Sequence, residues 1–224
     1  MSDRRQSPCN VCGRDTDHDI VWQDNTAKEI PDGSATGVKT LALRCRGCGD
    51  CSLCEEEWYH DGLPYEGNES TITSTRFKPP RLWRRTPDWL ERIESTDPEL
   101  FDILVEIYSA ANPQQVRLLS VGVRTALDHL MIKMLGGDFG SFEQKLDEMV
   151  TTGHLTSSQR DDLAIVVDAG SASSHRGFKP PRELLEGMLM VMEGLVRDYY
   201  VTGPMLKTAK ASIPPKPPRQ RRSS

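Results

Sequence analysis

The stretch CRGCGDCSLC, residues 45–54, places a cysteine at every third position, and an earlier pair stands in CNVCG, residues 9–13. A spacing of two residues between cysteines lets both thiolates of one tight turn reach the same metal ion, and two such turns supply the four ligands that zinc prefers. Both pairs at 9–13 and 45–49 share the pattern CxxCG, in which the glycine lets the chain turn with positive φ. We therefore predict one structural Zn²⁺ site formed by Cys9, Cys12, Cys45 and Cys48.

The remaining cysteines and nearby histidines leave an alternative open. Cys51 and Cys54 form the weaker pair, because Glu55 rather than glycine follows them. Together with His18 and His60 they would serve as other ligands or as a second site, but we favour free thiols and surface histidines. A site closed by four protein ligands has no open position for water, so the metal is expected to be structural and not catalytic. Its binding energy would hold together a module too small to fold by burial alone.

The residues between the two cysteine pairs have the pattern of a small β zinc ribbon. Segments 18–23 and 37–45 read as strands, and PDGS at 31–34 marks the turn between them. A third strand is expected at 53–60. All six cysteines lie within the first 54 residues, so we assign residues 1–62 to the ribbon.

A basic, proline-rich linker is expected at residues 63–85. Its second half, RFKPPRLWRR, interleaves basic and aromatic residues, and arginine beside an aromatic ring can stack bases and pair phosphates. We favour an extended connector for this segment and keep RNA or DNA binding as the alternative. The residues concerned are Arg76, Phe77, Lys78, Arg81, Trp83, Arg84 and Arg85.

Residues 86–202 have the pattern of an all-α helical bundle. Helix starts are marked by polar caps and by proline in the first turn, near residues 86, 97, 112, 141, 157 and 180. The helix after residue 112 is the strongest, because its apolar residues recur at three- and four-residue steps and two glycines end it. Its inward face is Val116, Leu119, Val123, Ala126, Leu127, Leu130 and Met134. The inward face of the last helix is Leu184, Leu185, Met188, Met192, Leu195 and Tyr199.

The charge of the chain is unevenly distributed. The net charge is −5 over 224 residues, whereas residues 203–224 hold six basic residues and no acidic one. We expect this tail to be disordered, and it is either a solubilising tail or a contact for nucleic acid.

The apolar runs are too short to span a bilayer. No apolar stretch follows the first arginines, so we expect a cytoplasmic protein without a signal peptide. Thiols stay reduced in the cytoplasm, which favours metal binding over disulfides.

Several segments resemble a bacterial protein family. They are the cysteine ribbon, the RFKPP and TPDWL segments, LLSVGVRTALDHLM at 118–131, GHL at 153–155 and DAGSASSHRGFKPP at 168–181. Together they are similar to the domain-of-unknown-function family 4145 over nearly the whole chain up to about residue 202. The resemblance implies a helical domain similar to the HEPN superfamily, whose members are often dimeric and often belong to phage-defence, restriction and toxin systems. Active members are metal-independent endoribonucleases with an arginine placed four to six residues before a histidine.

The catalytic pattern that the resemblance implies is degenerate in this chain. In such a site the histidine acts as general acid or base and the arginine stabilises the charge on the phosphate. The positions where the arginine would precede His175 hold Asp168, Ala169 and Gly170, while Arg176 follows the histidine. We therefore expect His175 to be a helix-terminal residue, with a role for His175 and Arg176 at a groove or dimer seam as the alternative.

A second match to the pattern lies between Arg124 and His129. Five residues of one helix rotate the chain by about 500°, so the two side chains point away from each other. We therefore expect Arg124 to be structural, paired with a carboxylate such as Asp168 or Asp128.

These observations favour a non-catalytic zinc-binding interaction module of a bacterial nucleic-acid or phage-defence-related system. The alternative is a metal-independent endoribonuclease that uses His175 with Arg176 or Arg124. A weaker third hypothesis is a redox sensor that uses Cys51 and Cys54. The expected partners are a second copy of the chain, an unidentified protein, and RNA or DNA bound through residues 76–85 and the basic tail. No membrane contact is expected.

Overall fold

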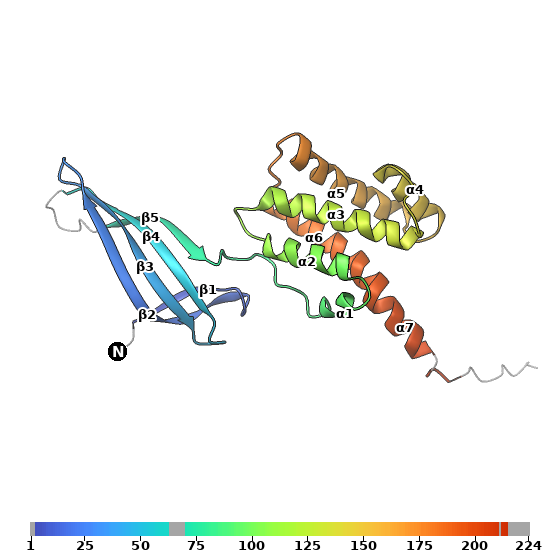
Figure 1. Ribbon diagram of the computed structural model, residues 1–224, viewed down its shortest axis with the longest axis horizontal. Coiled ribbons are helices and arrows are strands. Elements are labelled where there is room, and N and C mark those ends of the chain that lie inside the picture. The colour runs from blue at the N-terminus through green and yellow to red at the C-terminus, as the bar shows by residue number, and fades with distance from the viewer. Residues whose placement is uncertain (1–2, 63–69, 211, 215–224) are drawn as a thin grey trace, which may run out of the picture. The chain divides into compact units, whose positions relative to one another are not determined.

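The computed structural model describes residues 3–62, 70–210 and 212–214, and the chain divides into two compact units (Figure 1). One unit comprises Met1–Arg85 together with Tyr108–Gln115, and the other comprises Thr86–Ile107 together with Val116–Ser224. The first contains a β-sheet and the second is helical. The predicted order of a β module followed by a helical bundle is confirmed.

The sheet is an antiparallel meander in which each strand pairs with the next one along the chain (Figure 1). The three predicted strands are confirmed and are longer than expected, and the turn at 31–34 joins two of them. The strands are β1 (Arg4–Cys9), β2 (Arg14–Glu29), β3 (Ala35–Cys45), β4 (Cys51–His60) and β5 (Thr71–Lys78).

Strand β5 corrects the predicted linker, because residues 71–78 belong to the sheet. It pairs with β4 from Leu53 opposite Lys78 to Tyr59 opposite Thr71. Ion pairs join the two strands: Lys78 contacts Glu55, and Arg76 contacts Glu57. Residues 63–69 of the predicted linker lie outside the described residues.

The sheet is curled, which gives it a concave face. Arg5 of β1 donates a hydrogen bond of 2.8 Å to Glu56 of β4, although β2 and β3 lie between these strands in the sheet. The same face carries the apolar core of the sheet, made of Leu41, Leu43 and Cys54 with Ile20 and Phe77 packed against them.

Every regular element among the described residues of the second unit is a helix, as predicted. Helix α3 packs against α4, α5 and α6 (Figure 1). Ser141 and Thr156 each form a capping box, at the N-termini of α4 and α5. The elements are α1 (Glu91–Glu94), α2 (Pro98–Ser109), α3 (Val116–Leu135), α4 (Phe142–Thr151), α5 (Ser157–His175), α6 (Arg182–Arg197), the π-helical turn η1 (Asp198–Thr202) and α7 (Gly203–Lys210).

The predicted inward face of α3 is buried, except that Met131 takes the place of the half-buried Met134. On α6, Leu185, Met188 and Met192 are buried as predicted. The prediction was wrong at Tyr199, whose exposed fraction is 38%. Tyr200 follows the buried Met192 and Val196 at four-residue steps, so it is the half-buried residue whose hydroxyl contacts Asp97.

The predicted disordered tail is wrong for residues 203–210. These residues form α7, because η1 carries the helical path of α6 onward past Gly203. None of the α7 side chains is buried. The basic residues from 215 onward lie outside the described residues. Among the described residues, no helix is both long enough and apolar enough to cross a membrane.

Candidate metal centre and catalytic residues

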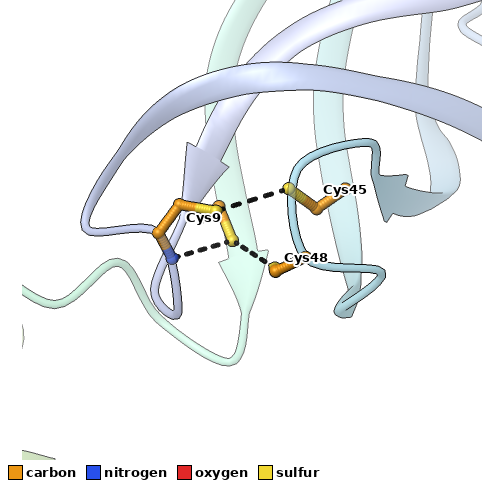
Figure 2. Close-up of side chains that lie close together, drawn as sticks. Cys9, Cys45 and Cys48 are labelled. Carbon is orange, nitrogen blue, oxygen red and sulfur yellow. Dashed lines mark hydrogen bonds between the residues drawn. The ribbon is translucent and has the colours of Figure 1, made fainter.

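Two turns of the sheet bring the predicted zinc ligands together. Cys9 ends β1 and Cys12 lies in the turn that follows, while Cys45 ends β3 and Cys48 lies in the turn before β4. The N–H of Arg46 donates to the carbonyl of Asp17 in β2, which anchors the second turn. Figure 2 shows Cys45 and Cys48 on this turn, facing Cys9.

The four sulfur atoms have the spacing of a tetrahedral metal site. All four lie within 4.8 Å of one another. The Sγ atoms of Cys9 and Cys48 are 3.5 Å apart, and those of Cys12 and Cys45 are 3.8 Å apart. Zinc–sulfur bonds of about 2.3 Å in a tetrahedron place neighbouring sulfur atoms roughly 3.8 Å apart. The four-cysteine cluster therefore suits a metal ion such as zinc and fits a zinc ribbon.

Hydrogen-bond donors point at the sulfur atoms. The N–H of Cys12 donates to Cys9 Sγ at 3.4 Å, and the N–H of Gly47 donates to Cys45 Sγ at 3.3 Å. The hydroxyl of Thr16 lies 3.1 Å from Cys45 Sγ. Such donors stabilise thiolates, which are the form of cysteine that binds metal.

The cysteines differ in how readily they lose their protons. Burial acts to raise the pKa of Cys45, but hydrogen bonds from Thr16 and from the backbone N–H groups of Cys48 and Gly47 outweigh it and lower the pKa to about 6. The pKa of Cys12 is raised to about 12, chiefly by its hydrogen bond with the sulfur of Cys48 and then by burial. A cation that binds all four sulfur atoms would displace the remaining protons.

The alternative ligands lie elsewhere. Cys54 is buried in the apolar core of the sheet, and Cys51 is exposed. His18 is buried, and its Nδ1 lies 2.9 Å from the carbonyl of Thr16. His60 accepts a hydrogen bond from the N–H of Gly62. Within residues 3–62, 70–210 and 212–214, no second group of three or more metal-binding side chains comes together.

Arg124 and His129 contact different helices. The guanidinium of Arg124 lies 4.8 Å from the centre of the Phe142 ring on α4. Nε2 of His129 lies 3.0 Å from both carboxylate oxygens of Asp97, which precedes α2. The expected carboxylate partners of Arg124 are engaged otherwise, because Asp168 pairs with Arg176 and Asp128 pairs with Lys145. Arg124 and His129 therefore do not meet at one site.

His175 and Arg176 lie at the C-terminal end of α5. His175 is the last residue of the helix and is exposed. The guanidinium of Arg176 turns back along the helix and lies 2.6 Å from the carboxylate of Asp168. Both members of this pair line a mainly apolar hollow of about 760 Å³ beside α5, together with Ile165, Phe178 and other residues. A phosphate in this hollow would compete with Asp168 for the arginine.

Sequence reasoning missed a buried polar cluster around Asp97. The Asp97 side chain is 2% exposed and accepts hydrogen bonds from the hydroxyl of Tyr200 at 2.5 Å and from the N–H of Leu100 at 3.1 Å, besides its contact with His129. The only local signal was Asp97 as the cap of α2, because Tyr200 is 103 residues away in the sequence.

The basic segment at 76–85 is largely paired with acidic side chains. Besides the pairs that Arg76 and Lys78 form with β4, Arg81 lies 3.3 Å from the carboxylate of Asp15. Little unpaired positive charge therefore remains on these three residues for a phosphate backbone.

Comparison with known proteins finds one family. The family model of the domain of unknown function DUF4145 matches residues 105–216, which is half of the chain. The match starts within α2, so it contains the candidate residues Arg124, His175 and Arg176 and excludes the cysteine cluster. No curated protein and no solved structure matches the chain. The chain belongs to the family of the domain of unknown function DUF4145.

Proposed function

We propose that this protein is a non-catalytic interaction module whose N-terminal sheet is held together by one structural zinc ion. The observation that carries the proposal is the set of four cysteine sulfur atoms within 4.8 Å of one another. Four protein ligands close the coordination sphere, so the metal stabilises the fold and activates no water.

The state of the catalytic candidates supports a binding role. The guanidinium of Arg124 lies against Phe142, and that of Arg176 is paired with Asp168. A general acid–base histidine needs a partner that stabilises charge on the phosphate, and His175 stands beside an arginine that is already neutralised. We propose that the helical unit is HEPN-like and that the protein is a bacterial, cytoplasmic component of a nucleic-acid or phage-defence-related system.

The partners that we propose are a second copy of the chain, another protein, or a nucleic acid. For nucleic acid, the acidic partners of Arg76, Lys78 and Arg81 favour the basic tail over residues 76–85.

Zinc content tests the metal part of the proposal. The purified protein is expected to contain one zinc ion per chain, and Cys9→Ser or Cys48→Ser is expected to release it. Cys51→Ser is the matched control, because Cys51 is exposed and lies outside the cluster. Loss of zinc in the control together with its retention in Cys48→Ser would show that the ligands are wrongly assigned.

Incubation with a mixed RNA pool tests the absence of catalysis. The zinc-loaded protein is expected to leave the RNA intact, with or without EDTA. Cleavage that resists EDTA and disappears in His175→Ala would establish the endoribonuclease alternative instead. Arg182→Ala provides a control for the loss of a basic side chain near His175 in the sequence, because Arg182 is paired with Glu186 within α6.

A further inference from the structure

A second hollow lies on the sheet, away from the cysteine cluster. It has a volume of about 260 Å³ and is lined by Asn25, Lys39, Glu56, Trp58, Ser70 and Ile72. Lys39 and Cys45 are both in β3, and six residues at about 3.3 Å each separate them by roughly 20 Å. The hollow is therefore distinct from the candidate metal centre.

Trp58 is held in a fixed orientation across the sheet. It stands opposite Gly37 in the β3–β4 register. A Cβ atom on Gly37 would lie 2.5 Å from Cζ2 and 2.6 Å from Cε2 of the indole, so only glycine leaves room for the ring. The indole Nε1 donates a hydrogen bond of 2.8 Å to Asn25 Oδ1 on β2. The ring thus extends from β4 over β3 to β2 before any ligand binds.

The charges beside the indole favour an anion. Glu56 is buried, with 6% of its surface exposed, and it is neutralised by Arg5 at 2.8 Å. Lys39 stands opposite Glu56 in the register and is half-buried, yet among the described residues no carboxylate lies within 4.0 Å of its Nζ. Within the part of the chain that the structure describes, one positive charge therefore remains at the hollow without a counter-charge.

We propose that this hollow binds a nucleotide, with the base stacked on Trp58 and the phosphate paired with Lys39. Aromatic side chains stack any base, because every base has a π-face. Ile72, which is 55% exposed, adds apolar surface at the rim, and Asn25 and Ser70 offer polar groups. The volume is below the roughly 300–1,000 Å³ of sites for drug-sized ligands, so it suits one ring system and its phosphate. Lys39 disfavours the cationic ligands that aromatic rings also bind.

The nucleotide has two sources, a free mononucleotide or one residue of a single-stranded nucleic acid. Binding of AMP and of a labelled single-stranded DNA 15-mer to the full-length, zinc-loaded protein distinguishes them. Equal affinity for both probes identifies a site for free nucleotides, whereas binding of the 15-mer alone identifies a site for single strands. Either outcome supports the proposal, and failure of the folded protein to bind both probes overturns it.

Paired variants locate the binding site. Trp58→Ala is expected to weaken binding about tenfold or more, since one stacking contact is lost. Lys39→Gln is expected to weaken it severalfold and to reduce the salt dependence by about one ion. The matched controls are Trp22→Ala and Lys28→Gln, because the register places both residues on the opposite face of the sheet. These controls are expected to bind like the original protein.

Two further measurements keep the test decisive. Trp58→Phe retains a ring over Gly37, so it is expected to fold and to keep part of the affinity if Trp58→Ala unfolds. Binding through the basic tail would be unaffected by Lys39→Gln and by either Trp58 variant, and that result refutes the site. Zinc content is measured on every variant, so a failure of nucleotide binding is separable from a failure of the metal centre.

Discussion

Asp97 links three parts of the helical unit through a single carboxylate. It caps α2 through the N–H of Leu100, contacts His129 of α3, and accepts a hydrogen bond from Tyr200 of η1. Burial acts to raise the pKa of Asp97, but hydrogen bonds from Tyr200, His129 and Leu100 outweigh it and lower the pKa below its usual value. The charged form of Asp97 is therefore the one that stabilises the fold.

Substitution of Asp97 is expected to destabilise the helical unit strongly. Asp97→Ala removes a helix cap and leaves the half-buried side chains of Tyr200 and His129 without this partner, which together cost at least about 2 kcal/mol in the free energy of unfolding. Tyr200→Phe removes one hydrogen bond and is expected to cost about 1 kcal/mol. Urea denaturation, monitored by the ellipticity at 222 nm, measures the loss in the free energy of unfolding for both variants.

Tyr199→Phe is the control, because the Tyr199 ring lies edge-on to the Tyr200 ring and the Tyr199 side chain is partly exposed.

The pH dependence of stability provides a second check. Since the folded pKa of Asp97 lies below the unfolded value of about 3.9, the stabilisation is complete above that pH and is lost as the pH falls through the folded pKa. The stability difference between the original protein and Asp97→Asn should shrink accordingly. A difference that stays constant down to acid pH would show that the carboxylate charge contributes nothing.

The contact between α3 and α5 depends on a glycine. A Cβ atom on Gly170 of α5 would lie 2.7 Å from Cβ of Arg124 and 3.1 Å from the carbonyl oxygen of Ser120, both on α3. Neither atom belongs to the flexible end of a side chain, so the two helices would have to separate. Gly170→Ala is therefore expected to cost about 1–3 kcal/mol of stability despite the better helix propensity of alanine.

Gly187→Ala in α6 is the matched control for this prediction. No atom of the described residues lies within 4 Å of a Cβ atom at Gly187, so alanine is expected to stabilise the protein by about 0.5–1 kcal/mol. Thermal unfolding of the two variants should therefore shift in opposite directions. Equal shifts would mean that the α3–α5 contact has room for a methyl group.

Elements with local signals were predictable, whereas those made by distant contacts were not. The apolar periodicity of helix α3 predicts its buried face, and the spacing of the four cysteines predicts their cluster. Strand β5 has only Ile72 and Phe77 as large apolar residues, and its ion pairs with Glu55 and Glu57 involve a strand about 20 residues earlier. In the Asp97 cluster, His129 and Tyr200 are 32 and 103 positions away from Asp97 in the sequence. No periodicity in the sequence predicts contacts between residues so far apart.

The two units differ in how much apolar surface holds them together. The buried core of the sheet is small, with Leu41, Leu43 and Cys54 at its centre, whereas the helical unit buries apolar residues from most of its helices. A small core rarely stabilises a fold alone, and a structural zinc ion adds its binding energy to folding. The metal should therefore contribute strongly to the stability of the sheet and hardly to the stability of the helical unit.

Removal of the metal is expected to unfold the sheet and leave the helices intact. In Cys48→Ser, or after chelation, the amides of β2–β4 should lose their protection from hydrogen exchange, because the ends of β1 and β3 are no longer held together. The thermal unfolding midpoint of the helical unit, monitored by ellipticity at 222 nm, should stay within about 3 °C of its original value. Such a shift corresponds to less than about 1 kcal/mol in a domain of this size. Chelation of Cys51→Ser should reproduce the effect, whereas Cys51→Ser with its metal should not show it. A single transition that moves both units together would show that the helices depend on the sheet, and the division into two compact units would then not extend to stability.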